Sequence, residues 1–430
     1  MDAVQTTSQS AILRKVSLRL IPFMLLLYVI AYLDRINISF AGLQMNKDLG
    51  FTPEIFGLGS GAFFIGYFLF GVPSNVMVAK LGARKWIAII MVAWGLLSTA
   101  FVEVKNVETF YLLRFLIGVA EAGFFPGMIL YLTYWFPRRE HAQAVSRFMT
   151  AIPLAGILGG LVASQVLQMH GILGLPGWKW LFLITGLPAI IFGFVVFFCL
   201  SDGPADCKWL SADERDRLCA FIEDDRKGVA ASAQSENVFG NPKVWTFAIL
   251  YFLLTLGMYG FQLWLPQIIE SFGKLTDSTA ALLSAIPAVF QAAGMILVAR
   301  NSDRTAERRL HVASCAWLAA SSLVLCAFCK DPILSLICLC ASAFGLWGVV
   351  GPFWALPTTY LGHNAKAAGI GLINSVGNLG GFAGPYLVGF IRQRNPDFMY
   401  SLFALAAPLV VAGIIVSFLR TEMAESSDKV

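Results

Sequence analysis

The chain has 430 residues, of which 57% are hydrophobic and 13% are charged, and its mean hydropathy is +0.71. Soluble domains carry about 25% charged residues, so this composition excludes a soluble globular protein and indicates many membrane-spanning helices. The net charge of +5 does not indicate nucleic-acid binding, because the basic residues are scattered among predicted loops and form no continuous patch.

Twelve apolar stretches are long enough to cross a bilayer, which takes about 20 helical residues. One hydrophilic segment, residues 201–242, divides them six and six. We therefore predict an all-α polytopic membrane protein with an N-terminal half (1–200), a cytoplasmic linker loop (201–242) and a C-terminal half (243–430). The predicted spans are 22–40, 56–78, 86–102, 110–135, 144–167, 180–200, 244–268, 279–299, 312–328, 333–356, 367–390 and 399–419.

The linker carries the signals of one short surface helix. Ser211 and Glu214 have the spacing of a capping box, in which each residue satisfies a backbone N–H of the other. Leu218, Phe221 and Ile222 continue an apolar stripe with helical spacing. We predict a short amphipathic helix within the linker.

The distribution of lysine and arginine predicts the orientation in the membrane. With a cytoplasmic N-terminus, the inner segments hold 22 of the 31 basic residues and the outer segments hold 7, the remaining two being Arg35 and Arg114 inside spans. Basic residues concentrate in cytoplasmic loops, so we predict that both termini are cytoplasmic.

Two charged residues lie in the apolar stretch 110–135. Arg114 and Glu121 are seven residues apart, so a helix places them on one face about 10 Å from each other, with Gly118 between them. A charge at the bilayer centre costs roughly 2.5–3.5 kcal/mol, so such residues normally face a wet cavity or a partner and mark a transport route. The gap at Gly118 is consistent with substrate access and with close helix packing.

A second charged pair, Asp34 and Arg35, lies in the first predicted span. One alternative is that both side chains sit at the outer end of the span and reach the lipid headgroups. They lie about thirteen residues into the span, however, and apolar or small residues continue to Gly42. This position favours burial.

The C-terminal half brings no charged residue into its first and fourth spans. It offers aromatic and amide side chains instead, and Asn374 and Asn378 share one helical face. An amide without a partner in hydrocarbon is costly, so we interpret these two residues, with Trp354, as substrate contacts. The N-terminal half would then bind the charged group of the substrate and the protons, and the C-terminal half would contact the rest of the substrate.

Metal and enzyme chemistry find little support in the sequence. Cys326, Cys329, Cys338 and Cys340 superficially resemble paired metal ligands, but they fall in apolar runs and match no zinc spacing. No H-E-x-x-H or G-x-S-x-G motif is present, and neither is a phosphate-binding loop. We expect no metal and no cofactor.

Five motifs span nearly the whole chain: Tyr32-Leu-Asp34-Arg35-Ile-Asn37-Ile, Pro73-Ser-Asn75, Gly82-Ala-Arg84, Arg114-Phe-x-x-Gly118-x-x-Glu121-Ala-Gly123-x-x-Pro126, and Asn374-Ser-x-Gly377-Asn378. Together they resemble the major facilitator superfamily. Within it the chain is most similar to the anion:cation symporter family, which includes carriers for tartrate, phthalate, hydroxyphenylacetate, nicotinate and sugar acids.

The resemblance implies the major facilitator fold of twelve transmembrane helices in two six-helix halves, with spans 1, 4, 7 and 10 around a central cavity. It implies that Asp34 and Glu121 carry protons and that Arg35 and Arg114 contact the substrate anion. We add Tyr67 to the predicted substrate contacts.

The resemblance also assigns gating loops. Arg84 follows the second span, and Asp303 with Arg304 follows the eighth. The acidic residue of the first loop falls on Ala79 in this chain, so that loop lacks the acid of the family's gating motif.

The four buried charges suggest how two fluxes are coupled. They sum to zero when both acids are ionised, and each proton taken up leaves an arginine less compensated, so an anion binds best to the protonated carrier. Glu121 lies further along the chain from Arg114 than Asp34 lies from Arg35. We therefore expect Glu121 to carry the coupling proton, with Asp34 as the second candidate.

The leading hypothesis is proton-coupled uptake of a small organic anion, such as an aromatic or hydroxy carboxylate, by alternating access. An exporter or exchanger of the same fold stays open, and a membrane-embedded enzyme or a nutrient sensor is a remoter alternative. We expect a monomeric multi-pass protein of the cell membrane, the inner membrane in a bacterium, whose partners are the anion, protons and lipid, without nucleic acid.

Overall fold

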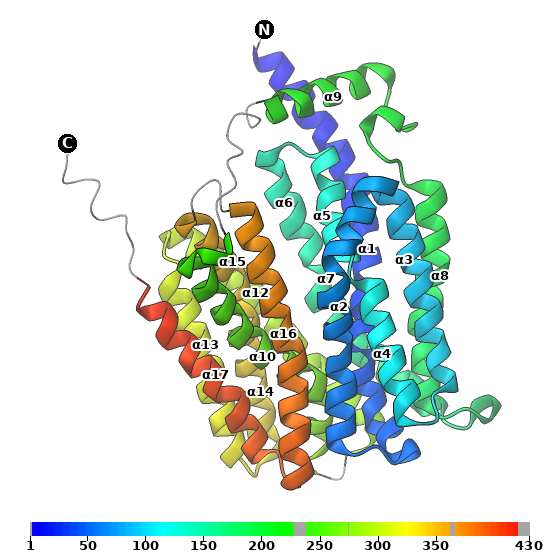
Figure 1. The fold of residues 1–430 in the computed structure, drawn as a ribbon, viewed down its shortest axis with the longest axis vertical. Coiled ribbons are helices and arrows are strands. Elements are labelled where there is room, and N and C mark those ends of the chain that lie inside the picture. Colours follow the sequence, from blue (N-terminus) through cyan, green and yellow to red (C-terminus); the bar gives the residue numbers. More distant parts are fainter. Residues whose placement is uncertain (1, 228–237, 274, 362–365, 420–430) are drawn as a thin grey trace. The chain divides into compact units, whose positions relative to one another are not determined.

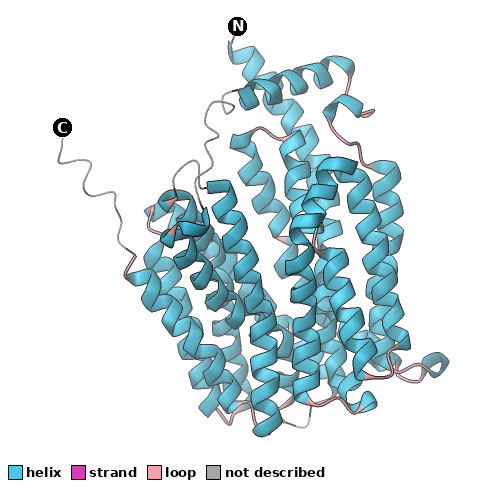
Figure 2. Cartoon of the chain, viewed as in Figure 1, coloured by secondary structure: helices cyan, strands magenta, loops and turns pink. Residues whose placement is uncertain are grey.

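The computed structural model describes residues 2–227, 238–273, 275–361 and 366–419. Within these ranges the chain is helical and contains no strand (Figure 2). The first nine helices are α1 (Asp2–Leu49), α2 (Pro53–Leu81), α3 (Ala83–Thr99), α4 (Val107–Glu121), α5 (Phe124–Trp135), α6 (Arg138–Met149), α7 (Ala151–Val166), α8 (Gly177–Cys199) and α9 (Ala212–Lys227). The remaining helices are α10 (Pro242–Glu270), α11 (Asp277–Leu283), α12 (Ala285–Thr305), α13 (Arg309–Phe328), α14 (Pro332–Gly348), α15 (Val350–Tyr360), α16 (Lys366–Arg394) and α17 (Met399–Ser417). Short 3-10 turns lie at Ala100–Glu103, Leu167–Met169, Ile172–Gly174, Pro204–Asp206 and Val238–Gly240.

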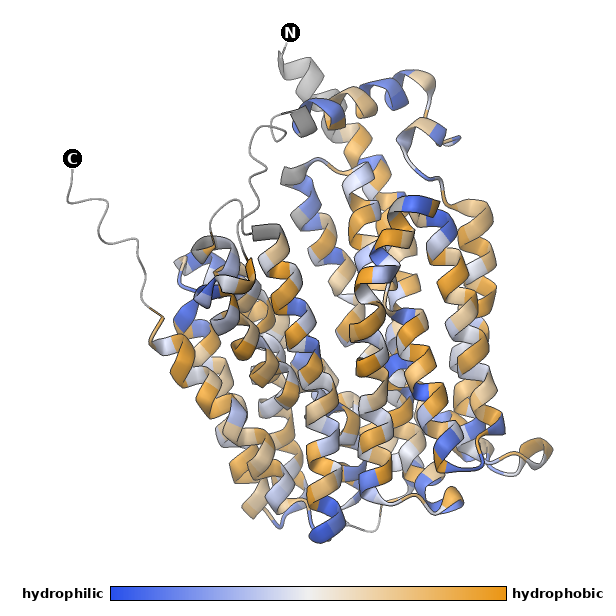
Figure 3. Ribbon diagram, in the orientation of Figure 1, coloured by the Kyte–Doolittle hydropathy of each residue, from blue (hydrophilic) through white to orange (hydrophobic). Residues whose placement is uncertain are grey.

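Eleven stretches of the described residues are long and apolar enough to cross a membrane, and they coincide with eleven of the twelve predicted spans. Figure 3 shows hydrophobic residues along the long helices and polar residues gathered at their ends. The first helix is longer than predicted, because α1 runs without a break for 48 residues. At 1.5 Å per residue it measures about 72 Å, more than twice the roughly 30 Å hydrocarbon core.

The remaining predicted span, 367–390, lies within α16. This helix has 29 residues and is therefore about 43 Å long, which is enough to cross a bilayer. Its many glycines and two asparagines lower its hydropathy, so it is not one of the eleven apolar stretches.

The fourth predicted span is interrupted at the residue that carries its acid. We expected one helix over 110–135, but α4 ends at Glu121 and α5 begins at Phe124. Gly123 and Pro126 explain the break, since proline has no N–H to donate and fits the first turn of a new helix. Glu121 is therefore the last residue of its helix.

The described chain separates into two compact units. Unit 1 comprises the described residues before 236 together with 262–285, and unit 2 comprises the described residues of 236–261 and 286–430. In unit 1, α3 packs along α8, α2 along α4, and α1 against α7 and α8 (Figure 1). In unit 2, α13 packs against α14 and α17. The boundaries predicted for the two halves stay a prediction.

Polar contacts hold residues 262–285 in unit 1. The Lys47 ammonium at the end of α1 lies 2.6 Å from Glu270 Oε1 and 3.0 Å from Asp277 Oδ1. Deeper in the unit, the Tyr32 hydroxyl donates to Gln262 Oε1 at 2.9 Å. These bonds join α1 to the C-terminal part of α10 and to α11.

The predicted linker helix is present as α9. Its capping box is formed, since Ser211 N–H donates to Glu214 Oε2 at 2.9 Å and Glu214 N–H donates to Ser211 Oγ at 3.2 Å. The Lys15 ammonium, 2.7 Å from Glu214 Oε2, holds the pKa of that carboxyl below its usual range, aided by the Ser211 N–H. Of the predicted apolar stripe, Leu218 and Ile222 are buried and Phe221 is half-buried.

Close packing of α2 against α4 within unit 1 explains the glycine at position 118. A Cβ built on Gly118 would lie 2.8 Å from the Phe63 carbonyl carbon and 3.0 Å from its Cα. Backbone atoms cannot move aside as a side chain would. Gly118 therefore serves close helix packing, which decides between the two interpretations of this glycine.

Gly118→Ala is expected to lower the free energy of unfolding by about 1–3 kcal/mol, because an overpacked contact forces the two helices apart. Gly71→Ala is the matched control, since a Cβ at Gly71 of α2 meets nothing within 4 Å. Thermal unfolding of the purified proteins in detergent measures both. Equal melting temperatures for the two variants would contradict close packing at Gly118.

The predicted orientation is tested by labelling single cysteines introduced into a cysteine-free background. Leu173 lies in the connection between α7 and α8 and is 83% exposed, and Asp224 lies on α9. We expect a membrane-impermeant maleimide to label position 173 in intact cells and position 224 only after permeabilisation. The reverse pattern would contradict cytoplasmic termini.

Candidate functional site

A buried ion pair joins α1 to α4 inside unit 1. Arg35 Nε donates to Glu121 Oε1 at 3.0 Å, and the Arg35 Nη2 donates to the same oxygen. Both side chains are removed from solvent, with relative side-chain exposures of 9% and 1%. An arginine and a carboxylate buried together are held by charge-assisted hydrogen bonds, which are stronger than neutral ones.

This pairing differs from the one that chain spacing predicts. By spacing alone, Glu121 is the acid further from its arginine, and Asp34 is the acid beside Arg35. In the structure Glu121 contacts Arg35 directly, because consecutive helical residues point in different directions while residues on two packed helices face each other. Spacing along one chain segment does not reveal such a pair.

Aromatic rings surround the Arg35 guanidinium. Its carbon lies 5.3 Å from the ring centroids of Phe63 and Tyr67 and 5.7 Å from that of Tyr32. The negative faces of such rings attract a cation, more strongly when water is excluded. Tyr67, a predicted substrate contact, therefore lies beside the predicted anion contact.

Arg114 of α4 lies near the pair but is poorly satisfied. Its guanidinium carbon is 5.2 Å from the Phe63 ring centroid. Its one hydrogen bond to a described residue, from Nη2 to the Ser60 carbonyl, is long at 3.4 Å. Nε and Nη1 have no hydrogen-bond partner within the described residues, although Arg114 is only 1% exposed. Coulombic interactions link it to Asp34 and Glu121. A buried guanidinium with two unused donors is suited to receive an anion.

The hydrogen bonds of Asp34 involve residues other than Arg35 and Glu121, although Arg35 is the next residue in the sequence. Its Oδ1 accepts from Ser98 Oγ of α3, from Asn37 Nδ2 at 3.0 Å and from Thr185 Oγ1 of α8 at 3.2 Å. Asp34 is 1% exposed, which excludes the alternative of a side chain reaching the headgroups. Three helices therefore converge on one carboxylate oxygen.

Sequence reasoning missed two polar residues of this region. Ser98 and Thr185 are buried within unit 1 and contact Asp34. The signal that points to them is a hydroxyl in an otherwise apolar span. That signal is weak, because most such hydroxyls donate to the carbonyl one turn earlier in their own helix.

Of the substrate contacts predicted in unit 2, Asn374 and Asn378 lie together on α16, and Trp354 lies on α15. Asn378 Nδ2 donates to the Asn374 carbonyl at 2.8 Å on α16, and both side chains are half-buried. The Trp354 ring of α15 packs edge-on against Tyr251, with centroids 4.8 Å apart. Their role in binding substrate stays a prediction.

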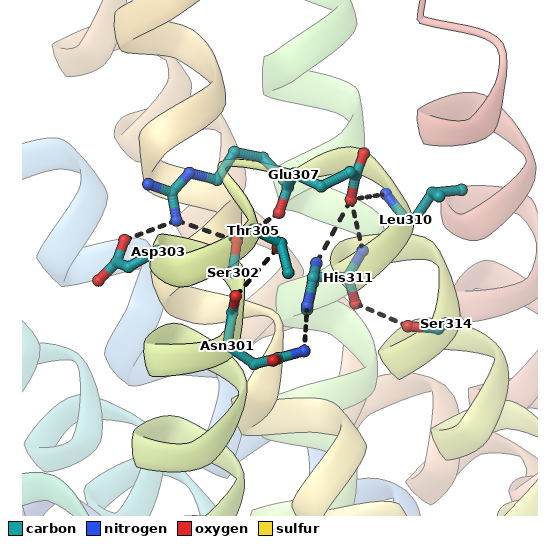
Figure 4. Close-up of polar contacts among 9 residues, drawn as sticks. Asn301, Ser302, Asp303, Thr305, Glu307, Leu310, His311 and Ser314 are labelled. Atoms are coloured by element: carbon teal, nitrogen blue, oxygen red, sulfur yellow. Dashed lines mark hydrogen bonds and ion pairs between the residues drawn. The ribbon is translucent and has the colours of Figure 1, made fainter.

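Two of the three predicted gating residues, Arg84 and Asp303, form local ion pairs within their units. Arg84 Nη2 lies 3.1 Å from Asp202 Oδ2, an acid outside the loop motif. In the connector between α12 and α13, Arg308 donates to Asp303 Oδ1 at 2.6 Å (Figure 4), and Arg304 is exposed. Neither contact tests a gating role.

The remaining bonds of this connector fix its turn. Ser302 Oγ donates to the Glu307 carbonyl at 2.6 Å, and Glu307 Oε2 accepts from Leu310 N–H at 2.8 Å (Figure 4). Ala306 has a left-handed backbone with φ of 54°. The carboxylate thus caps the first turn of α13, where a negative charge is favourable.

Comparison with known proteins identifies relatives over nearly the whole chain. Residues 24–385 match the Major Facilitator Superfamily. A putative tartrate transporter of Agrobacterium vitis is 45% identical over 98% of this chain and 98% of its own length, and a quinolone resistance transporter of Acinetobacter baumannii is 38% identical over 95% and 94%. The fold resembles that of a bacterial homologue of the human lysosomal transporter Spinster, with a TM-score of 0.76 at 15% identity over 92% of this chain and 95% of the other.

Proposed function

The chain belongs to the Major Facilitator Superfamily and is a membrane transporter, not an enzyme, and from this premise we propose that it takes up a small organic anion together with protons. The proposed substrates are aromatic or hydroxy carboxylates, and the putative tartrate transporter among the relatives supports this class. We place the protein in the cell membrane, the inner membrane in a bacterium, with both termini in the cytoplasm.

The observation that carries this proposal is Arg114. Its Nε and Nη1 are buried without a hydrogen-bond partner in the described residues, and leaving charged donors unsatisfied is expensive. A planar guanidinium gives two parallel hydrogen bonds to a carboxylate from one edge, either Nη1 with Nη2 or Nε with Nη2. A carboxylate substrate at either edge therefore satisfies one of the two unpartnered nitrogens of Arg114.

Coupling to protons follows from competition for Arg35. Glu121 occupies this guanidinium when ionised, so an arriving carboxylate and Glu121 compete for the same donors. A proton added to Glu121 removes the charge that attracts Arg35 and releases the guanidinium to the substrate. Binding of the anion then favours binding of the proton, and the reverse also holds, which is positive coupling between two sites.

Export or exchange is the second candidate, and one relative favours it. The quinolone resistance transporter is 38% identical to this chain over 410 residues, and a transporter can give resistance by carrying a compound out of the cell. The same buried charges serve either direction, because the cycle follows the gradients that are imposed.

A thermal-shift screen of the purified protein tests the proposal. We expect hydroxy or aromatic carboxylates to raise the melting temperature, more at an acidic than at a neutral pH, since ligand at 100 times its dissociation constant stabilises by about 2.7 kcal/mol. The uncharged amides of the same compounds are the control. Stabilisation by the amides but by no carboxylate would contradict an anion carrier.

A further inference from the structure

Asp34 has a hydrogen-bonding arrangement that the Arg35–Glu121 pair does not explain. Three neutral donors from three helices meet on Oδ1: Ser98 of α3, Asn37 of α1 and Thr185 of α8. All three donors are buried, with exposures of 0%, 2% and 6%. Such a convergence fixes the orientation of the carboxylate plane.

The other oxygen of Asp34 is left open. Oδ2 is buried and has no hydrogen-bond partner within the described residues, and Asp34 has no ion-pair partner there. The charged groups that act on it are Glu121 and Arg114, both of α4. Buried polar atoms are nearly always satisfied, so an unpartnered carboxylate oxygen at the centre of unit 1 needs a reason.

The Thr185 hydroxyl can donate its hydrogen to either of two acceptors. Its hydroxyl has one hydrogen, and two acceptors lie within reach: Asp34 Oδ1 at 3.2 Å and the Leu181 carbonyl at 2.9 Å. It also accepts from Asn37 Nδ2 at 2.8 Å, which keeps the oxygen in place. The hydroxyl hydrogen can therefore turn between the two acceptors without any helix moving.

We propose that Ser98, Asn37 and Thr185 position Asp34 for proton transfer, so that Oδ2 takes up and releases a proton separately from the Arg35–Glu121 pair. The inference rests on the proposed proton coupling. Hydronium gives its proton to Oδ2, which leaves water and a neutral carboxylic acid, and the Thr185 hydrogen turns from Oδ1 to the Leu181 carbonyl. Loss of the proton to water reverses both changes.

The three donors are positioning residues, since they act through Asp34. Thr185→Val removes the hydroxyl and keeps the branched shape, and Thr185→Ser restores the hydroxyl. Ser98→Ala removes the second donor. Ser164→Ala is the matched control, because Ser164 is a buried serine of α7 whose hydroxyl donates only to the Leu161 carbonyl of its own helix.

The test compares two activities of each variant in proteoliposomes, with tartrate as the probe. Counterflow exchanges substrate without net proton movement, and accumulation requires an imposed proton gradient. We expect Thr185→Val and Ser98→Ala to lower accumulation about tenfold, the scale of one hydrogen bond to a charged group, while counterflow stays near that of the parent. Thr185→Ser and Ser164→Ala should keep both activities.

Four outcomes would overturn the inference. If Thr185→Val accumulates as much substrate as the parent, the Thr185 hydroxyl has no part in the proton step. An equal fall of both activities, or failure of Thr185→Ser to restore accumulation, would show that Thr185 supports only the fold. If the parent exchanges tartrate but accumulates none in a proton gradient, the proposed coupling fails as well, which separates that failure from one confined to Thr185.

Discussion

Replacing Arg114 by lysine is expected to lower uptake about tenfold to a hundredfold, although the positive charge is kept. An ammonium is a single compact charge and cannot give two parallel hydrogen bonds to one carboxylate. A hydrogen bond to a charged group contributes about 1.5–3 kcal/mol, which corresponds to this range. The measurement is initial uptake of a labelled carboxylate by cells that produce equal amounts of each protein.

Arg147→Lys is the matched control for this prediction. Arg147 is an exposed residue of α6 whose guanidinium donates to Ser17 Oγ at 3.0 Å. We expect this variant to transport like the parent. If Arg114→Lys takes up substrate like the parent, the role of Arg114 is structural: its positive charge then only balances the negative charges of Asp34 and Glu121 in the interior.

Replacing Glu121 by glutamine is expected to separate exchange from accumulation. The neutral amide cannot hold Arg35 by charge and cannot exchange a proton, so it imitates the protonated carrier. The variant should bind substrate and perform counterflow, yet it should not concentrate substrate when a proton gradient is imposed. Both activities are measured side by side in proteoliposomes.

Glu108→Gln serves as the control, because Glu108 is an exposed acid in the first turn of the same helix, α4. It should keep both activities. Continued accumulation by Glu121→Gln would show that the proton on Asp34 suffices for coupling without one on Glu121, or that no single carboxylate is essential. Loss of counterflow as well would indicate that Glu121 is needed to hold the site together.

Much of the fold follows from the sequence because hydrocarbon imposes one rule on every span. A helix that crosses lipid must be apolar over about 20 residues, and eleven stretches show this plainly. The capping box at Ser211 and Glu214 is equally local, so it was predicted and is formed. Predictions hold where the determining residues are close together in the chain.

The features that the sequence did not reveal depend on distant residues. Arg35 and Glu121, which are in contact, lie 86 positions apart in the chain, and Thr185 and Asp34 lie 151 positions apart. The break between α4 and α5 is a local exception, because Gly123 and Pro126 are present in the sequence. Glycine and proline are common inside membrane helices, so their presence alone does not predict an interruption.

Direct detection of proton movement tests the central claim that anion and proton travel together. Proteoliposomes containing the protein and a trapped pH-sensitive dye receive a hydroxy carboxylate such as tartrate on the outside, with no gradient imposed. We predict that the lumen becomes more acidic as the anion enters, and that vesicles with Glu121→Gln show no such change. Entry of labelled anion through the parent protein without acidification of the lumen would contradict proton-coupled uptake.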